Sequence, residues 1–238
     1  NFAGLNRHVE LYTTPADAYV ADIAVTTDSL DGIARDARTA ETASIAYDVA
    51  IGTGESDKAR GLQAAVRILD GNGTTVASAT SDVVYEDDES ARARGTIDIA
   101  DARLWNPAAA YLYTAVVTLS EDGTATRPRI VDEYRQTFGV RTVEVRGTRF
   151  LINGEPFYFK GFGKHEDSYF HGRGTDDVLN VKDVSLIHWL HANSFRTSHY
   201  PYAESMYDLC DREGIVVIDE VPAVGMSWAQ YANPLVGR

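Results

Sequence analysis

The order of predicted elements in the second half of the chain constrains the fold more than any other feature. A strand-like segment, FLINGEPFYFKG (150–161), precedes a helical pattern over 175–193, a short strand over 194–198, a helix from about Ala203 to Glu213, and the apolar run 215–218. Short links between alternating strands and helices predict a parallel sheet with right-handed crossovers. The wholly apolar last run indicates a strand that is buried on both faces.

The ends of these elements carry signals of their own. Asn153 and Gly154 form a turn signal between two apolar runs. Thr175 or Asp176 is placed to cap the first helix, and Gly214 is placed to end the second, because glycine adopts the left-handed conformation found at many helix ends. The period of the first helix is set by Leu179, Leu186 and Leu190, flanked by Val184 and Ile187.

Residues 19–138 show a different pattern, in which about seven short β-branched or aromatic runs alternate with turn residues. The clearest runs are 20–27, 42–51, 62–70, 74–80, 111–120 and 131–138. This spacing predicts an antiparallel β-sandwich. The cysteine pair of antibody domains is absent, so an immunoglobulin-like label depends on the number of strands. Two polar stretches, 52–61 and 85–95, are predicted to be solvated loops.

Charge and composition exclude several classes of partner. The chain has 22 Lys and Arg against 35 Asp and Glu, a formal net charge of -13, which disfavours nucleic acid and anionic membranes as partners. Apolar runs are too short to span a bilayer, and the first residues do not follow the plan of a signal peptide. Cys210, the one cysteine, is predicted to be a buried core thiol. We therefore expect a soluble, cytoplasmic protein.

Polar residues follow three successive predicted strands. They lie in GFGKHED (161–167), in Arg196 to His199, and at Asp219 and Glu220. The carboxyl ends of parallel strands meet at one edge of a sheet, so these residues are expected to share one rim. The expected set is Lys164, His165, Glu166, Asp167, Arg196, His199, Asp219 and Glu220. An ordinary loop charge or ion pair explains any single acid equally well, and the convergence of three clusters favours a ligand site.

The residue types on this rim suit a neutral ligand that is rich in hydroxyl groups. Glycoside cleavage would need two carboxyl groups, about 5 Å apart for retention or about 6.5–9.5 Å apart for inversion. The candidate acids are Glu166, Asp167, Asp219 and Glu220, and their spacing leaves the pairing open. The histidines at 165, 171, 188, 191 and 199 lack the spacing of a metal site, and no nucleophile elbow or phosphate-binding loop is present. No metal or cofactor is expected.

These residues resemble glycoside hydrolase family 2, and within it the β-glucuronidases most closely. The family signature is matched along residues 193–218 by Asn193, Phe195, Arg196, Thr197, Ser198, His199, Tyr200, Pro201, Asp211, Gly214 and the apolar run 215–218. The remaining likeness is carried by NFAGLNRHVELY (1–12), LWNP and YLY within 104–113, FGVR (138–141), FLINGEPFYFKG (150–161) and GFGKHED (161–167). The resemblance therefore extends from one end of the chain to the other.

The resemblance implies a multidomain protein with β and α/β parts. Residues 1–18 would be the end of a sugar-binding jelly roll, 19–138 an immunoglobulin-like β-sandwich, and 139–238 the first βα units of an incomplete (β/α)8 TIM barrel. The chain is thus expected to be a fragment. The whole protein is expected to be a homo-oligomer.

The implied reaction is retaining hydrolysis of terminal β-D-glucuronides, a step of carbohydrate metabolism. The resemblance assigns substrate binding to His199, His165 and Asp167, and support to Arg196 and Glu220. Both catalytic Glu residues are expected downstream of Arg238, because the family's Asn-Glu pair is absent here. The chain alone is therefore expected to be inactive. The alternatives are a β-galactosidase or β-mannosidase of the same family, or a non-catalytic structural fragment.

Overall fold

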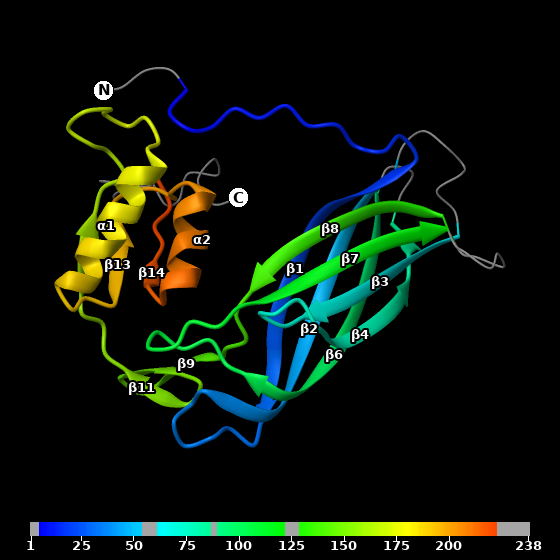
Figure 1. Cartoon of the computed structure of the whole chain (residues 1–238), viewed down its shortest axis with the longest axis horizontal. Helices are drawn as coiled ribbons and strands as arrows, with labels where there is room; N and C mark the ends of the chain where they lie inside the picture. Colours follow the sequence, from blue (N-terminus) through cyan, green and yellow to red (C-terminus); the bar gives the residue numbers. More distant parts are fainter. Residues whose placement is uncertain (1–4, 54–60, 87–89, 122–128, 223–238) are drawn as a thin grey trace, which may run out of the picture. The chain divides into compact units, whose positions relative to one another are not determined.

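The computed structural model describes residues 5–53, 61–86, 90–121 and 129–222. The chain forms two compact units (Figure 1), one containing residues 1–10 and 158–238 and the other residues 11–157. In the first unit, the backbone carbonyl of Asn6 accepts a hydrogen bond from the amide of Thr175 at 2.9 Å. The boundaries at residues 18 and 138, and the jelly-roll origin of residues 1–18, remain predictions.

The unit of residues 11–157 contains two four-stranded antiparallel sheets. The first has the order β1-β2-β6-β5, with bounds Ala18–Asp31, Thr39–Thr53, Ser90–Arg103 and Val84–Tyr85. The second has the order β4-β3-β7-β8, with bounds Thr75–Asp82, Leu62–Leu69, Tyr113–Glu121 and Ile130–Phe138. Each of the six runs given above for residues 19–138 is confirmed as a strand. The immunoglobulin-like topology stays a prediction.

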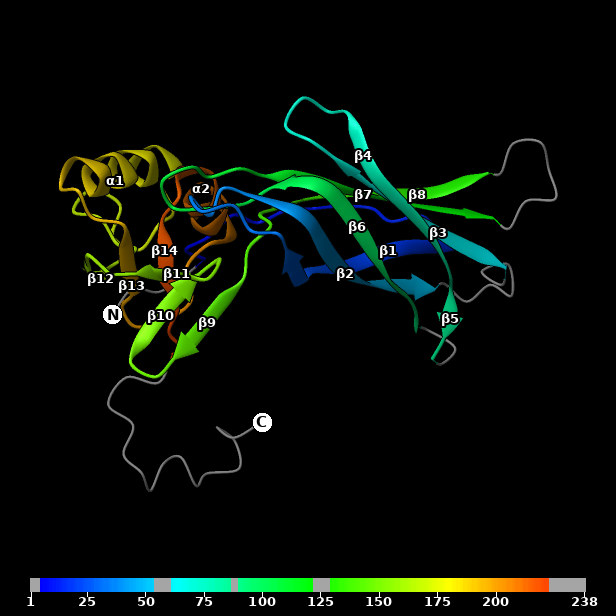
Figure 2. The same ribbon diagram turned by 90° about the horizontal axis from the view of Figure 1, so that it is seen from below.

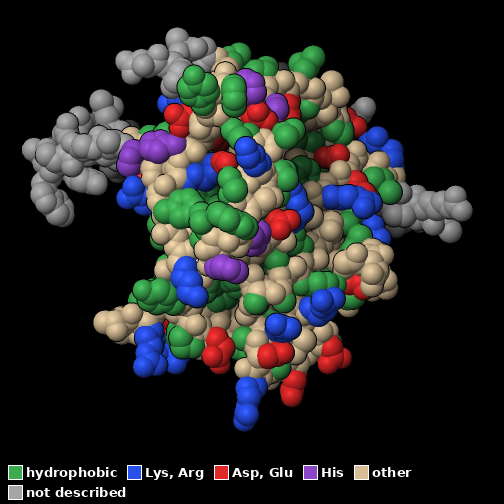
Figure 3. All heavy atoms as spheres, turned by 60° about the vertical axis from the view of Figure 1, so that its left-hand side comes forward, with side chains coloured by type: hydrophobic (Ala, Val, Ile, Leu, Met, Phe, Trp, Pro, Cys, Tyr) green, Lys and Arg blue, Asp and Glu red, His purple; other side chains and the backbone are tan. Residues whose placement is uncertain are grey.

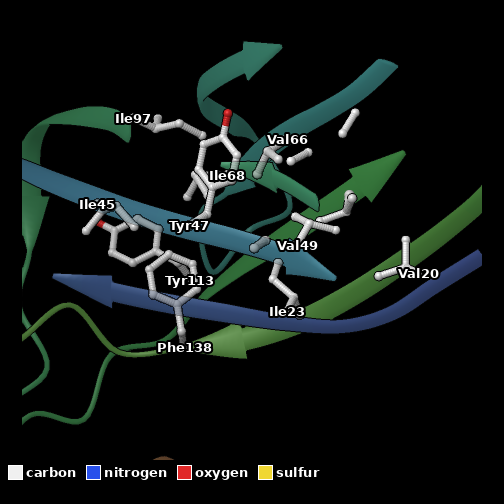
Figure 4. Packing of buried hydrophobic residues seen from close by; sticks show 14 of the residues in the cluster. Val20, Ile23, Ile45, Tyr47, Val49, Val66, Ile68, Ile97, Tyr113 and Phe138 are labelled. Carbon is white, nitrogen blue, oxygen red and sulfur yellow. The ribbon is translucent and has the colours of Figure 1, made fainter. Parts of the chain in front are cut away.

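The two sheets share one hydrophobic core, because alternate residues of each strand point inward. On β2 the inward residues are Ile45, Tyr47, Val49 and Ile51, and Figure 4 shows several of these side chains meeting Val66 and Ile68 of β3. The rings of Tyr113 and Phe138, on β7 and β8, lie with centroids 5.9 Å apart. This core accounts for the run of β-branched and aromatic residues in the sequence.

The prediction of a loop over 85–95 is wrong for most of its described residues, because β5 ends at Tyr85 and β6 begins at Ser90. Ala91 and Ala93 are buried, whereas Arg92 and Arg94 lie on the other face of β6, where both bind Asp48 of β2. A strand was missed because its inward residues are small and its outward residues are charged. Of the loop predicted over 52–61, residues 54–60 lie outside the described residues.

A small antiparallel sheet follows, with strands β9 Val143–Arg146, β10 Arg149–Ile152 and β11 Glu155–Phe157. The predicted turn at Asn153 and Gly154 is confirmed, with φ of 51° and 78° as a type I′ turn requires. Asn153 is also buried, and its side chain binds three backbone groups. Its Oδ1 accepts from the amide of Thr142 at 3.0 Å, and its Nδ2 donates to the carbonyls of Trp105 at 3.0 Å and Ala37 at 3.3 Å.

Three parallel strands form the sheet of the other unit. They are β12 Gly161–Lys164, β13 Ser194–Thr197 and β14 Val216–Ile218, in that order. The helices α1 Asp177–Trp189 and α2 Glu204–Glu213 connect them and cover the same face of the sheet (Figure 1 and Figure 2). The predicted parallel strand and helix order is confirmed. Gly161–Lys164, predicted to follow a strand, is itself a strand.

The helix ends follow the sequence signals, but the buried face of α1 does not. Asp176 caps α1 by accepting a hydrogen bond from the amide of Leu179 at 3.0 Å, and Gly214 ends α2 with a φ of 71°. The buried residues of α1 are Asn180, Val184 and Ile187. Leu186 and the C-cap residue Leu190 are instead 46% and 57% exposed.

The core of this unit contains Phe195 of β13, Met206 and Cys210 of α2, and Ile215. Cys210 is buried as predicted, and burial raises the pKa of its thiol to about 12. The prediction that the run 215–218 is buried on both faces is wrong at its end, because Ile218 is 46% exposed. The helices cover only one face of the sheet, and within the described residues β14 is an edge strand. The described helices include none that is long and apolar enough to cross a membrane.

Candidate functional site

Glu220 links two of the three clusters that the sequence places at strand ends. Its Oε1 lies 3.1 Å from Nε of Arg196, at the end of β13, and its Oε2 lies 3.2 Å from Nδ1 of His199. Glu220 itself follows β14 by two residues. One carboxylate therefore binds a guanidinium from β13 and an imidazole that follows β13 by two residues. The peptide bond between Ser198 and His199 is cis.

The third cluster contacts the other two through His165, which directly follows β12. Its ring lies edge-on to the ring of His199, with centroids 5.5 Å apart and an interplanar angle of 81°. Nδ1 of His165 is 3.9 Å from Oδ1 of Asp167. The side chains of His165, Asp167 and His199 are 56%, 43% and 40% exposed, so a ligand in solution can reach all three. Figure 3 shows histidine, basic and acidic side chains together at the surface.

The contact with Glu220 sets the hydrogen-bonding state of His199. An ionised carboxylate only accepts hydrogen bonds, so Nδ1 of His199 must carry a hydrogen to bind it. In the neutral imidazole, Nε2 is then the acceptor, and in the protonated ring it is a second donor. The other ring nitrogen of His199 can thus accept from, or donate to, a hydroxyl group of a ligand.

Two of the expected rim residues have structural roles instead. The side chain of Glu166 is only 4% exposed, and its carboxylate accepts hydrogen bonds from the amide of Ala203 at 2.6 Å and from Arg7 at 3.2 Å. Ala203 is the N-cap of α2 and has no side-chain cap of its own, so Glu166 closes that helix end. Lys164 is buried and pairs with Asp183 of α1 at 2.8 Å. Expecting Glu166 and Lys164 at the rim was therefore wrong.

Asp219 is also engaged within the protein. Its Oδ1 accepts hydrogen bonds from the hydroxyls of Thr197 at 2.8 Å and Tyr207 at 2.7 Å. Burial, followed by the hydrogen bond to Asp219, raises the pKa of Tyr207 to about 12, so its hydroxyl stays protonated as a donor. The sequence motif includes Thr197, but Tyr207 carries no sequence signal, because a tyrosine inside an amphipathic helix is an ordinary core residue.

Three of the four candidate acids are engaged in contacts within the protein. Glu166, Asp219 and Glu220 are each held by hydrogen bonds or ion pairs, and Asp167 lies near His165. Among the described residues, no group of three or more His, Cys, Asp or Glu side chains could hold a metal ion. The described part of the site is therefore suited to binding and orienting a polar ligand.

A hollow on the sandwich is lined by none of these residues. Its volume is about 450 Å³, and its lining includes Asp48 and Arg94. These two side chains bind each other at 3.0 Å, and hydrogen bonds from Arg92 and Arg94 lower the pKa of Asp48 against the opposing effect of burial. Its charges are thus already paired, and its remaining lining is small side chains and Tyr47.

Comparison with known proteins defines the class to which the chain belongs. Residues 18–141 match the family model described as glycosyl hydrolases family 2, and residues 143–237 match the TIM barrel domain of the same family. Together these matches cover nearly the whole chain. The chain belongs to glycosyl hydrolase family 2.

Within this family, the chain is similar to β-glucuronidases. It is 73% identical to a β-glucuronidase of Bifidobacterium dentium solved in complex with coumarin-3-O-glucuronide, with a TM-score of 0.91 over 99% of this chain and 36% of that one. A β-glucuronidase of Ruminococcus gnavus, solved with D-glucuronic acid, is 40% identical, with a TM-score of 0.71 over 90% of this chain and 32% of that one. A β-glucuronidase of Paenibacillus borealis is 45% identical over 97% of this chain and 34% of its own length. The chain therefore spans about a third of the length of these relatives.

Proposed function

We propose that the whole protein hydrolyses terminal β-D-glucuronides and retains the anomeric configuration. The observation that carries this proposal is the 73% identity to a β-glucuronidase that was solved with a bound glucuronide. The alignment behind that identity covers 99% of this chain, and the fold of this chain brings His165, His199 and Glu220 into one cluster. The cluster supports the proposal because its exposed imidazoles and carboxylate suit a hydroxyl-rich ligand.

In this proposal His199, His165 and Asp167 bind the sugar. Each is at least 40% exposed on its side chain, whereas the neighbouring Lys164 is 8% exposed and paired within the protein. Arg196 and Glu220 support the site rather than contact the sugar. The two oxygens of Glu220 bind Arg196 and His199. A sugar hydroxyl hydrogen-bonded to Nε2 of His199 would then be held by a ring whose orientation Glu220 fixes.

Retaining hydrolysis needs two further carboxyl groups, one to protonate the leaving oxygen and one to attack the anomeric carbon. We assign both to polypeptide that follows Arg238. The absence of the family's Asn-Glu pair from residues 1–238 supports this assignment. The residues described here would supply binding and orientation, which favour the reaction by holding the substrate near the reacting groups.

The test is a comparison of three chromogenic substrates with the protein expressed from its complete reading frame. We expect 4-nitrophenyl β-D-glucuronide to be hydrolysed with a kcat/KM at least about 100-fold above the β-galactoside and the β-mannoside, because the site rejects a sugar that leaves its polar groups unpaired. A larger kcat/KM for either of those substrates would overturn the assignment to glucuronides. Hydrolysis of none of the three would overturn the assignment as a glycosidase of these classes.

Two other expectations concern the whole protein and stay predictions. The resemblance to the family predicts a homo-oligomer, and light scattering on the complete protein tests this prediction. The cytoplasm is the proposed compartment because a single buried thiol suits a reducing environment, and cell fractionation checks it.

A further inference from the structure

The hydroxyl of Tyr207 connects the two chain segments that carry His199 and Glu220. It accepts a hydrogen bond from the amide of Tyr202 at 2.8 Å, in the turn that follows His199. It donates one to Asp219 at 2.7 Å, the residue directly before Glu220. Tyr207 lies on α2 and contacts neither His199 nor Glu220 through these two hydrogen bonds. It therefore acts on the cluster through Tyr202 and Asp219.

The hydroxyl of Thr197 also links the segment that carries His199 to the segment that carries Glu220. It donates to Asp219 at 2.8 Å and accepts from the amide of Glu220 at 2.8 Å. Thr197 is fully buried and precedes His199 by two residues on the chain. The hydroxyl therefore ties the end of β13 to the backbone of the residue whose side chain orients His199.

These four hydrogen bonds make a closed network around the backbone of residues 197–202 and 219–220. Thr197 and Asp219 are each bound twice, and Tyr207 is bound on both sides. The side chain of Glu220 is 28% exposed and contacts two cationic or titratable groups, so the backbone network limits how far it can shift. A displacement of about 1 Å in a positioned group can cost on the order of 100-fold in rate.

We propose that Tyr207 and Thr197 are positioning residues, which hold Glu220 and, through it, the ring of His199 in the orientation that binds the sugar. This inference rests on the proposed function for its kinetic consequence, and on the described contacts alone for its structural one. It assigns a role in the site to two hydroxyl groups that touch no substrate. The role predicts that losing either hydroxyl moves Glu220 rather than merely loosening α2.

Two matched pairs of variants in the complete protein test the proposal. Tyr207→Phe removes the bridging hydroxyl, and Tyr113→Phe is its control, because the Tyr113 hydroxyl likewise accepts from a backbone amide, that of Arg103 at 2.8 Å, but within the sandwich. Thr197→Val removes the second hydroxyl, and Thr197→Ser restores it. The measurements are kcat and KM for the glucuronide, and a crystal structure of each folded variant.

We expect Tyr207→Phe and Thr197→Val each to lower kcat/KM by about 10-fold or more, whereas Tyr113→Phe and Thr197→Ser stay within about 3-fold of the parent. In the structures, the contact between Nδ1 of His199 and Oε2 of Glu220 should be lost in the first two variants only. An unchanged kcat/KM in either would overturn the proposal, as would an equal loss in Tyr113→Phe. If Tyr207→Phe does not fold, the comparison of Thr197→Val with Thr197→Ser decides whether the positioning role stands.

The failure of this inference is distinguishable from the failure of the proposed function. If the parent protein hydrolyses none of the three glycosides, the proposed function fails, and the crystal structures alone judge the positioning role. A His199–Glu220 contact that stays intact in both Tyr207→Phe and Thr197→Val would then overturn it. A contact that is lost in both would support it whatever the ligand is.

Discussion

The carboxylate of Glu220 lies between a guanidinium and an imidazole, and this position defines its role. Both of its oxygens have a partner within 3.2 Å, so Glu220 orients the side chains of Arg196 and His199. His199 is held by one ring nitrogen only, which leaves the other for a ligand. At this scale the site consists of one orienting acid and two histidines open to solvent.

The first prediction concerns His199. In the complete protein, His199→Ala should lower kcat/KM for the glucuronide by about 10- to 100-fold, because a hydrogen bond to a charged or polar ligand group contributes about 1.5–3 kcal/mol. The control is His188→Ala, since His188 is also half-exposed and paired with an acid, Glu213 at 3.4 Å, but on the helices. Equal kinetics for the two variants would remove His199 from the site.

At the scale of elements, the Asn153-Gly154 turn shows what a sequence signal contains and what it omits. The turn is predictable because asparagine and glycine accept positive φ. The buried role of the Asn153 side chain is not, since its partners at Ala37 and Trp105 are 116 and 48 residues away along the chain. A local pattern reports backbone conformation, whereas these contacts depend on tertiary packing.

The second prediction follows from that buried side chain. Asn153→Ala should destabilise the protein by about 2–4 kcal/mol, because it leaves buried backbone groups without partners and places alanine at positive φ. Asn153→Gly separates the two causes, since glycine relieves only the backbone strain. Urea unfolding monitored by tryptophan fluorescence measures both variants. A loss below about 0.5 kcal/mol for Asn153→Gly would show that the side-chain hydrogen bonds contribute little.

The third prediction concerns the ion pairs between β2 and β6. The pKa of Asp48 is lowered from 3.8 in the folded protein, because hydrogen bonds from Arg92 and Arg94 outweigh the effect of burial. A lowered carboxyl pKa adds stability above the unfolded value, and this stability is lost as pH falls through the folded value. Asp48→Asn should therefore destabilise the protein at pH 7 but not well below pH 3.8.

Urea midpoints at pH 7 and at the lowest pH where the protein remains folded measure this difference. Asp28→Asn, an exposed acid on β1, serves as the control for a general change in net charge. A destabilisation by Asp48→Asn that is the same at both pH values would show that the lost ion pairs are not its cause.

Elements were easier to predict from the sequence than the detailed site. The strands β13 and β14 and the ends of α2 followed from apolar runs and Gly214, whereas β12 was displaced by several residues. The strand β6 was missed because Ala91 and Ala93 give a weak apolar signal. Glu166 looked like a site residue because its position in sequence is the same whether its carboxylate faces a ligand or caps a helix. Only the fold shows that it binds Ala203.

In the whole molecule, the described parallel sheet is smaller than the domain that the family match names. The parallel sheet of the described residues has three strands, with β12 and β14 at its edges, whereas the matched family domain is a TIM barrel. A barrel leaves no edge strand, because its sheet is closed. Among the described residues, the two edge strands and exposed side chains such as Ile218 fit a chain that spans about a third of the length of its relatives.

The fourth prediction is therefore that residues 1–238 alone will not hydrolyse the glucuronide that we propose the complete protein cleaves. The physical reason is the proposed origin of both catalytic carboxyl groups outside this chain. The measurement is release of 4-nitrophenol by the two proteins at equal concentration, with circular dichroism to check folding. Turnover by the 238-residue chain that is lost in Glu220→Gln would reverse the assignment of the catalytic acids.

We propose that the carboxyl ends of β12, β13 and β14 bind a sugar at His199. A crystal structure of the complete protein with D-glucuronic acid is the decisive test. We expect a sugar hydroxyl within hydrogen-bonding distance of Nε2 of His199, with Nδ1 still bound to Glu220. A sugar bound elsewhere, with no contact to His199, His165 or Asp167, would contradict it.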